Sequence, residues 1–287
     1  MSTMKPFPVP VVSLLGPGSQ DDASPEYLPM PQGMDTYRPP SLPEPEDFVA
    51  RGGCVAVLRE ALAALRRPTA IDAMHVVDLD ALRTEDRTLL NQVLGEGEVA
   101  AQVLDAGGQP VVRVQESVFA GVWRVLDLRD GAAVRDTLQM GRCPDVLVRL
   151  AHGGPPADPA APAPAGVMNA PSLLAELDDR RQRLEPGDPP HVVNLTLLPL
   201  TEADSQHLDA VLGAGRVRIL SRGYGNCRIV DTRLPGTWRV TYFNSTDINI
   251  LDTLEVCRVP EVACAAAEDL HDSAERLHEV LQWVQAD

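Results

Sequence analysis

Val93-Leu94-Gly95-Glu96-Gly97-Glu98-Val99 recurs further along the chain as Val211-Leu212-Gly213-Ala214-Gly215-Arg216-Val217. Three more stretches recur in the same order: Val122-Trp123-Arg124-Val125 as Thr237-Trp238-Arg239-Val240, Asp136-Thr137-Leu138 as Asp252-Thr253-Leu254, and Cys143-Pro144-Asp145-Val146 as Val259-Pro260-Glu261-Val262. Matched positions lie 115 to 118 residues apart, so the repeating unit has the size of a small domain. We call the copies repeat one and repeat two. Shared residues are expected to be scaffold, and residues found in one copy are candidates for function.

Both repeats follow one predicted order of elements. Apolar periodicity predicts a first helix near residues 57–65 and 173–177, and a strand follows at 76–79 and 192–195. A second helix is expected to open where Thr84 and Thr201 can cap it, and to end at glycines 95 and 213. The remainder alternates as strands joined by tight turns. Hairpins without long crossovers predict an α+β fold of two tandem pseudo-symmetric units, each a largely antiparallel sheet with helices.

A long helix is predicted at the end of repeat two. It is expected to begin at Pro260 and to carry an apolar stripe from Val262 to Val284. Repeat one has only a short equivalent. The stripe must be covered, either by the sheet of repeat two or by repeat one.

Two Pro-rich segments flank the repeats. Residues 1–48 contain 11 of the 26 prolines and no helical period, which predicts an extended or disordered arm. A second low-complexity stretch between the copies predicts a linker. The expected organisation is an arm at 1–48, repeat one at 49–152, a linker at 153–169 and repeat two at 170–287.

Composition excludes several classes of protein. Across 287 residues, Lys+Arg 25 against Asp+Glu 41 gives a net charge of −16, which disfavours nucleic acid and anionic lipid and favours a cationic partner. No apolar run approaches the roughly 20 residues of a membrane span, and no secretory signal pattern is present. We therefore expect a cytoplasmic protein without membrane insertion. The five cysteines form no CxxC pair and no His lies at metal-ligand spacing, so neither a metal nor another cofactor is expected.

The differences between the repeats indicate a candidate site in repeat two. Ser221-Arg222-Gly223-Tyr224-Gly225-Asn226-Cys227 replaces an ordinary turn of repeat one, and Tyr242-Phe243-Asn244-Ser245 replaces Leu126-Asp127-Leu128-Arg129. The candidates for a binding site are therefore Gly223, Tyr224, Gly225, Asn226, Cys227, Tyr242 and Asn244. The alternative is that these residues only pack a tighter turn.

Evidence for catalysis is weak. Cys227 or Ser221 could act as a nucleophile with His207 or His191, but their spacing gives no sign that they meet. The shared Asp136 and Asp252 are expected to form structural hydrogen bonds, and the shared Trp123 and Trp238 to lie in the core or at a domain interface.

The N-terminal arm adds a second group of candidates. Tyr27, Met30, Met34 and Tyr37 place aromatic and soft side chains in a Pro-rich context, which suits adaptable contacts with an apolar surface. The alternative is a plain spacer.

Several of these stretches resemble the HupH/HyaF/HoxQ family of [NiFe]-hydrogenase expression proteins. The resemblance rests on Lys5-Pro6-Phe7-Pro8, Tyr27-Leu28-Pro29-Met30-Pro31, residues 90–99, residues 115–125, and the stretches at 221–227, 237–240, 242–245 and 251–256. It implies a non-enzymatic maturation factor that binds the iron–sulfur small subunit precursor of a membrane-associated hydrogenase before twin-arginine export. It also implies a thioredoxin-like partner of the HupG/HyaE type. It supplies no catalytic residues.

Two other functions stay open. A redox or iron–sulfur carrier could use Cys227 with a second thiol, although the absence of paired cysteine motifs argues against it. An enzyme acting on a small ligand in a groove of repeat two would need convergent titratable groups.

Overall fold

The structure is a computed structural model, and it describes residues 48, 51–67, 73–151, 153, 155–223 and 225–285. Repeat one contributes α2 (Gly52–Leu65), β1 (His75–Asp78), α3 (Thr84–Leu94), β2 (Val99–Leu104), β3 (Pro110–Glu116), β4 (Val122–Arg129), β5 (Ala132–Met140) and α4 (Asp145–Arg149). Repeat two contributes α5 (Ala170–Arg183), β6 (His191–Asn194), the 3₁₀ helix η1 (Leu195–Leu197), α6 (Glu202–Leu212), β7 (Val217–Ser221), β8 (Asn226–Asp231), β9 (Thr237–Phe243), β10 (Asn249–Val256), the 3₁₀ helix η2 (Glu261–Ala263) and α7 (Ala267–Gln285).

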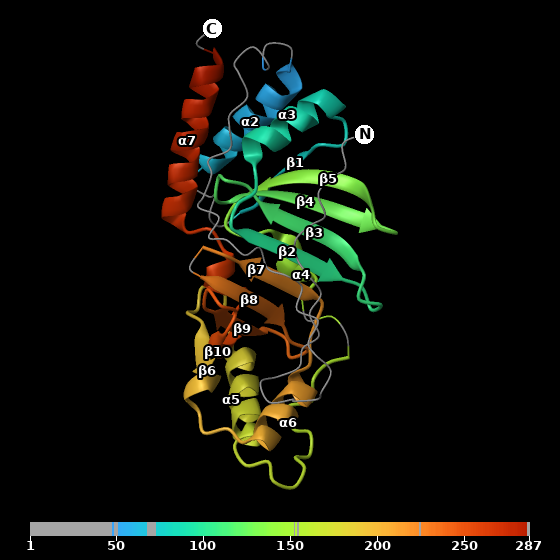
Figure 1. The fold of residues 1–287 in the computed structure, drawn as a ribbon, viewed down its shortest axis with the longest axis vertical. Coiled ribbons are helices and arrows are strands. Elements are labelled where there is room, and N and C mark those ends of the chain that lie inside the picture. Colours follow the sequence, from blue (N-terminus) through green and yellow to red (C-terminus); the bar gives the residue numbers. More distant parts are fainter. Residues whose placement is uncertain are drawn as a thin grey trace.

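The strands of the described residues form one ten-stranded antiparallel sheet that runs through both repeats (Figure 1). Its order is β1-β5-β4-β3-β2-β7-β8-β9-β10-β6. Strands β1 to β5 of repeat one correspond to β6 to β10 of repeat two, so the order of equivalent strands is the same from either edge of the sheet. The halves meet where β2 pairs with β7, and Ala101 lies opposite its own equivalent, Ile219. A local two-fold axis therefore passes between these residues. The predicted α+β class and pseudo-symmetry are confirmed, while the four-part division of the chain stays a prediction.

One face of the sheet carries a core shared by both repeats. Trp123 and Trp238 are fully buried there, as predicted, among the valines and isoleucines of β2, β3, β7 and β8. Residues of α4 and η2 pack over the same face. One apolar layer spans the β2–β7 junction. The repeats are therefore held together by hydrophobic burial as well as by backbone hydrogen bonds.

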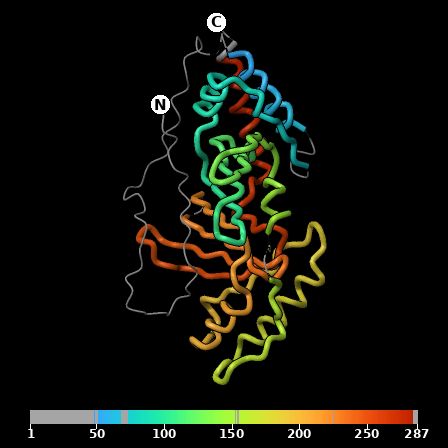
Figure 2. The backbone as a smooth tube through the Cα atoms, turned by 90° about the vertical axis from the view of Figure 1, so that its right-hand side faces the viewer, coloured from blue at the N-terminus to red at the C-terminus, as the bar shows by residue number. Residues whose placement is uncertain are grey.

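The opposite face carries a separate core in each repeat. The core of repeat one contains apolar residues of α2, α3 and α7, and the core of repeat two contains apolar residues of α5 and α6. Figure 1 shows these helices at the two ends of the molecule, with the sheet between them. In Figure 2 the β9–β10 hairpin stands out from the side of the body.

Helix α7 belongs to repeat two in sequence but packs on repeat one. Leu270, Ala274, Leu277 and Leu281 join the core beneath α2 and α3. Gly121 makes room for this contact: its φ is +79°, and a Cβ there would lie 2.0 Å from Leu270 Cδ2. The apolar stripe is therefore covered by the other repeat, which was one of the two expected solutions.

The predicted start of this helix at Pro260 is wrong. Residues 261–263 form the short η2, Cys264 is extended, and α7 begins at Ala267. The backbone N–H of Ala265 donates to the carbonyl of Arg142 at 2.9 Å. The chain therefore crosses to repeat one in extended form before the helix can start.

The two predicted threonine caps differ. Thr201 caps α6 through a capping box with Asp204. Thr84 is instead the first residue of α3, after Arg83, and its side chain makes no cap hydrogen bond. The expected helix ends are confirmed, since glycines 95 and 213 both have φ of 54°.

The segments predicted as arm and linker contact the repeats where they are described. Phe48 is buried, and its ring meets that of Trp283 edge-on, with 6.5 Å between centroids. Ala157, Ala161 and Val167 pack against the core of repeat two. Part of the predicted linker thus covers repeat two.

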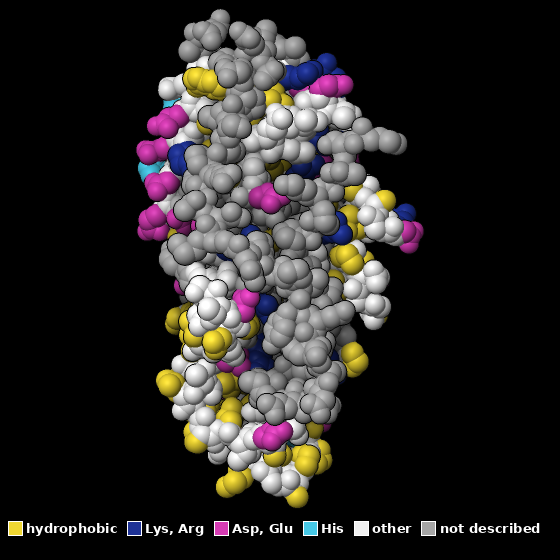
Figure 3. Space-filling model, in the orientation of Figure 1, with side chains coloured by type: hydrophobic (Ala, Val, Ile, Leu, Met, Phe, Trp, Pro, Cys, Tyr) yellow, Lys and Arg dark blue, Asp and Glu magenta, His cyan; other side chains and the backbone are white. Residues whose placement is uncertain are grey.

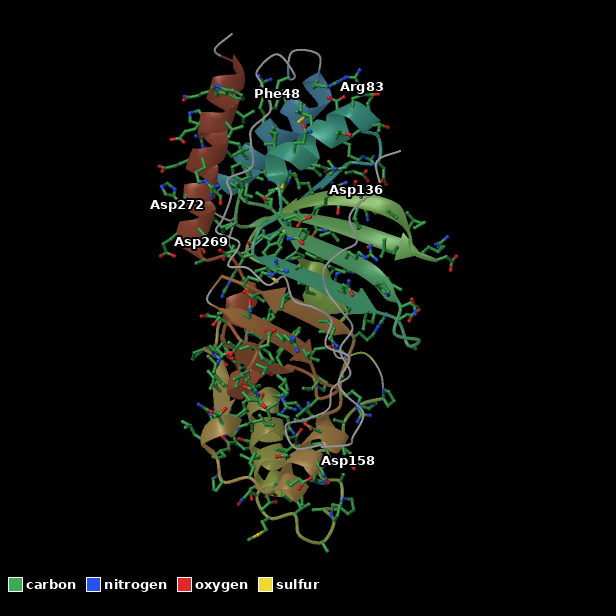
Figure 4. The ribbon with its side chains drawn as sticks, viewed as in Figure 1. Phe48, Arg83, Asp136, Asp158, Asp269 and Asp272 are labelled. Atoms are coloured by element: carbon green, nitrogen blue, oxygen red, sulfur yellow. The ribbon has the colours of Figure 1, made fainter. Side chains whose placement is uncertain are left out.

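Buried Glu116 gives the α7 side of repeat one a pH-dependent stability. Burial, together with the charges of Glu98 and of Asp269 on α7, raises the pKa of Glu116 to about 7, although the N–H of Gly121 donates to its carboxylate at 3.2 Å. Figure 4 labels Asp269 at the sheet end of α7. The folded state thus holds a proton that the unfolded state releases near pH 4.5, so this contribution to stability falls as pH rises from about 4.5 to 7.

We expect Glu116→Gln to remove that dependence. Relative to the wild type, the variant should gain up to about 3 kcal/mol in free energy of unfolding between pH 5 and pH 8. Urea unfolding at both pH values measures the change. Glu96→Gln is the control, because Glu96 is exposed and should shift the curve far less. Parallel pH curves for wild type and Glu116→Gln would contradict the assignment.

Candidate functional site

The candidate loop of repeat two lies at the junction between the repeats. Gly223 and Gly225 are exposed, and Gly225 has φ of +102°. A Cβ on Gly223 would lie 2.1 Å from Glu98 Oε2, and the N–H of Arg222 donates to the carbonyl of Glu98 at 3.1 Å. Gly223 therefore lies against the side chain of Glu98 in repeat one. The remaining sequence candidates Tyr27, Met30, Met34, Tyr37 and Tyr224 lie outside the described residues.

The structure brings Cys227 and Tyr242 together. They are cross-strand partners on β8 and β9, and Cys227 is fully buried in the shared core. Burial and the charge of Glu255 raise the pKa of Cys227 to about 12, although a hydrogen bond with Tyr242 opposes the shift. Burial, the neighbouring Cys227 and the charge of Glu255 raise the pKa of Tyr242 to about 12. At neutral pH both groups are uncharged, and a buried neutral thiol is a poor nucleophile and metal ligand.

The two candidate asparagines have local partners. Asn226 is the first residue of β8 and pairs with Phe243. The side-chain oxygen of Asn244 accepts from the backbone N–H groups of Thr246 and Ile248, both at 2.9 Å, and from the Thr246 hydroxyl at 2.8 Å. Asn244 thus builds the β9–β10 turn.

Neither proposed nucleophile meets a proposed base, since Ser221 is the cross-strand partner of Cys227 and lies on the same face of the sheet. Cys227 lies in the core on one face of the sheet, whereas His207 is buried on α6, over the other face. His191 lies at the far edge of the sheet on β6, where its Nε2 is 2.8 Å from Glu176 Oε1.

Cys143 and Cys264 meet across the repeats, which their distance in sequence could not reveal. Their thiols share a hydrogen bond that raises the pKa of Cys143 and lowers that of Cys264. Within the described ranges, no group of three or more His, Cys, Asp or Glu side chains is arranged to hold a metal ion. In the same residues, no helix is both long and apolar enough to cross a membrane.

A partly buried ion-pair network in repeat two contains the shared Arg239 and Asp252. Arg239 donates from Nε and Nη2 to Asp252, at 3.0 and 2.6 Å, and from Nη1 to Asp209 at 2.5 Å. The N–H of Asp252 donates to Thr196 Oγ1 at 2.8 Å. Burial lowers the pKa of Arg239, but the two carboxylates outweigh it and raise the pKa further above its ordinary value. The predicted structural role of Asp252 is confirmed, and Asp136 pairs with Arg124 in the same way.

A pocket of about 300 Å³ opens beside this network. It lies between η1, α6 and the strands β9 and β10, and it is lined by Leu195, Thr196, Leu198, Leu200, Ser205, Leu208, Asp209, Leu212, Arg239, Asn249, Asp252 and Leu254. Large aliphatic residues nearby are exposed: Leu197 by 79%, Ile248 by 61% and Ile250 by 57%. Figure 3 shows hydrophobic side chains gathered at this end of the molecule. The site therefore combines carboxylates with an apolar rim.

Comparison with known proteins places this architecture in a family. The model for "HupH hydrogenase expression protein, C-terminal conserved region" matches residues 53–152 and 167–284. The chain is 52% identical over 284 residues to hydrogenase expression/formation protein HoxQ of Cupriavidus necator, covering 98% of this chain and 99% of that protein. It is 46% identical over 284 residues to HupH of Rhodobacter capsulatus, covering 97% and 98%.

More distant relatives have similar names. The hydrogenase-1 operon protein HyaF of Escherichia coli is 36% identical over 275 residues, covering 94% of this chain and 95% of that protein. A solved structure of hydrogenase expression protein HupH from Thiobacillus denitrificans is 30% identical, covers 40% of this chain and 93% of its own, and has a TM-score of 0.36. Since the family model spans both repeats and the relatives align over nearly the whole chain, this protein belongs to the family of HupH hydrogenase expression proteins.

Proposed function

We propose that this protein is a hydrogenase maturation factor: a non-catalytic, cytoplasmic chaperone that binds the iron–sulfur small subunit precursor of a membrane-associated [NiFe] hydrogenase before twin-arginine export. A thioredoxin-like protein of the HupG/HyaE type is its proposed partner. Names of near full-length relatives, which are hydrogenase expression/formation proteins, support the maturation role.

The observation that carries the chaperone assignment is the surface of repeat two. Exposed aliphatic residues lie beside a pocket that contains Asp209 and Asp252, and the chain has a net charge of −16. Such a surface favours a client segment that is cationic and apolar. The twin-arginine precursor has this chemistry. The buried, uncharged thiol of Cys227 and the pairing of His191 with Glu176 support binding rather than catalysis.

Affinity capture tests this proposal. The tagged full chain should retain the small subunit precursor from hydrogenase-expressing cells, and a purified precursor should bind directly. Precursor without its signal peptide separates recognition of the signal from recognition of the mature subunit. Replacing Tyr27, Met30, Met34 and Tyr37 together with serine should weaken capture if the arm takes part. No direct binding of either precursor form would refute the chaperone role.

Cys227 separates this function from the alternative of a redox or iron–sulfur carrier. We expect Cys227→Ala to leave hydrogenase maturation intact, because the side chain is buried and neutral. Cys227→Ser should be destabilised by about 1–2 kcal/mol, because it buries a hydroxyl group. Hydrogenase activity in complemented cells and thermal unfolding of the purified variants measure the two effects. Complete loss of maturation in a folded Cys227→Ala protein would favour the carrier.

A further inference from the structure

We propose that the pocket of repeat two binds the guanidinium group of an arginine supplied by a partner peptide, in the position that the chain's own Arg87 fills in repeat one. This assigns a ligand chemistry to the pocket. It rests on the comparison of the two repeats and does not depend on which client the protein serves.

The structure fixes the equivalence of α3 and α6. Asp86 on α3 accepts from the N–H of Cys54 at the start of α2, and Asp204 on α6 accepts from the N–H of Ala170 at the start of α5. Both helices end at a glycine with φ of 54°. With these anchors 118 residues apart, Arg87 corresponds to Ser205.

Arg87 fills its site in repeat one through three contacts. Its Nη2 donates to the carbonyl of Leu79 at 2.6 Å and to that of Asp80 at 3.3 Å. Its Nε lies 3.7 Å from Asp136 Oδ2. The guanidinium group thus joins the turn after β1 to the buried carboxylate on β5. Figure 4 labels Asp136 on the sheet beneath α3.

Repeat two keeps the acceptors but loses the donor. Leu195 and Thr196, the equivalents of Leu79 and Asp80, line the pocket, and so does Asp252, the equivalent of Asp136. The turn has the same attachment in both repeats, because Asp80 and Thr196 each accept from the N–H of the equivalent aspartate, at 3.0 and 2.8 Å. Ser205 also lines the pocket, and its side chain is too short to take the place of an arginine.

The charge difference points the same way. Repeat two has Asp209 where repeat one has Asn91. It therefore gains a carboxylate in addition to losing the equivalent of Arg87. The set Asp80, Arg87, Asn91, Arg124 and Asp136 is neutral overall, whereas its equivalents Thr196, Ser205, Asp209, Arg239 and Asp252 carry a net charge of −1. Arg239 already donates to both carboxylates. A cation entering the pocket would neutralise the remaining charge beside these partly buried carboxylates.

The geometry favours arginine over lysine and defines its neighbours. A planar guanidinium group can reach two backbone carbonyls and a carboxylate together, as Arg87 does, whereas an ammonium group is a compact point charge. Leu198 and Leu200 line the pocket, and Leu197 is exposed beside it. Apolar residues should therefore flank the arginine of the partner.

Fluorescence anisotropy with a labelled Ala-Leu-Arg-Leu-Ala peptide and the full-length protein tests the proposal. Peptides with lysine or with citrulline, the neutral isostere, replace the arginine. We expect the arginine peptide to bind about tenfold or more tightly than the citrulline peptide, with lysine between them, because charge-assisted hydrogen bonds are lost. Binding should also weaken with salt. Equal binding of the arginine and citrulline peptides, or no binding of either, would overturn the proposal.

Variants of the pocket supply the controls. Ser205→Arg places the repeat-one residue in the pocket and should reduce binding at least about tenfold without unfolding the protein, whereas Ser205→Ala should bind as the wild type does. Undiminished binding by a folded Ser205→Arg protein would exclude this pocket.

Arg38 is the arginine of the N-terminal segment 1–47. A tenfold gain in peptide affinity in Arg38→Gln would indicate that the chain's own Arg38, and not a partner's arginine, occupies the pocket. These assays contain no hydrogenase component, so their failure would leave the capture experiment to decide the chaperone role.

Discussion

Replacing Leu277 with alanine is expected to lower the free energy of unfolding by about 2–5 kcal/mol, because it leaves a cavity in a core that the leucine fills. Leu277 is fully buried on α7, among residues of repeat one. Although the substitution lies in the sequence of repeat two, the structural damage should be in repeat one. Guanidinium unfolding measures the loss, and hydrogen exchange locates it.

The exchange pattern is the decisive part of that experiment. Amides of α2 and α3 should lose protection more than those of α5 and α6, since α7 packs on the former pair. Glu279→Ala, on the exposed face of the same helix, should change stability by no more than about 0.5 kcal/mol. Loss of protection centred on α5 and α6 would show that α7 belongs to the core of its own repeat.

The placement of α7 marks the limit of what local sequence can predict. Its apolar period indicates a helix with a buried face, and the recurring Trp-Arg-Val and Asp-Thr-Leu stretches indicate matching strands. Neither pattern says which repeat receives the helix. That choice depends on the extended crossing at Cys264 and Ala265 and on the space left by Gly121, and all of these are tertiary features.

The continuous sheet was equally hidden from sequence reasoning. The internal repeat predicts two similar units, but the pairing of β2 with β7 joins them into one sheet. Val99–Leu104 and Val217–Ser221 are the strands of each repeat that lie at this junction. The nearly continuous apolar run of the first and the alternation of the second are equally compatible with a separate sheet in each repeat.

The candidate site was only partly accessible from sequence. Comparing the repeats draws attention to Cys227 and Asn244, whose side chains prove to be buried in the core or used within a turn. The same comparison contains the change from Arg87 to Ser205. It becomes informative only when the structure shows that Arg87 contacts the turn after β1 and that Ser205 lines a pocket.

The two Arg–Asp networks should respond differently to loss of their shared arginine. We expect Arg239→Ala to lower the free energy of unfolding by about 3 kcal/mol or more, because it leaves Asp209 and Asp252 without their cation. Arg124→Ala should cost about 1–2 kcal/mol less, since Asn91 is neutral and Arg87 stays near Asp136. Urea unfolding of both variants measures the difference, and equal costs would contradict it.

Adding Ser205→Arg to this pair uses stability to test whether the pocket accepts an arginine. An arginine at 205 should reach the carbonyls of Leu195 and Thr196 and the Asp252 carboxylate, as Arg87 reaches their equivalents. The cost of Arg239→Ala should then fall toward that of Arg124→Ala, and the coupling between positions 205 and 239 should be about 1–2 kcal/mol in a double-mutant cycle. Ser205→Met is the matched control, because it fills the volume without the charge and should produce no such coupling. If methionine and arginine at 205 rescue equally, the pocket lacks volume rather than a cation, and the equivalence of the two networks would not extend to their charge.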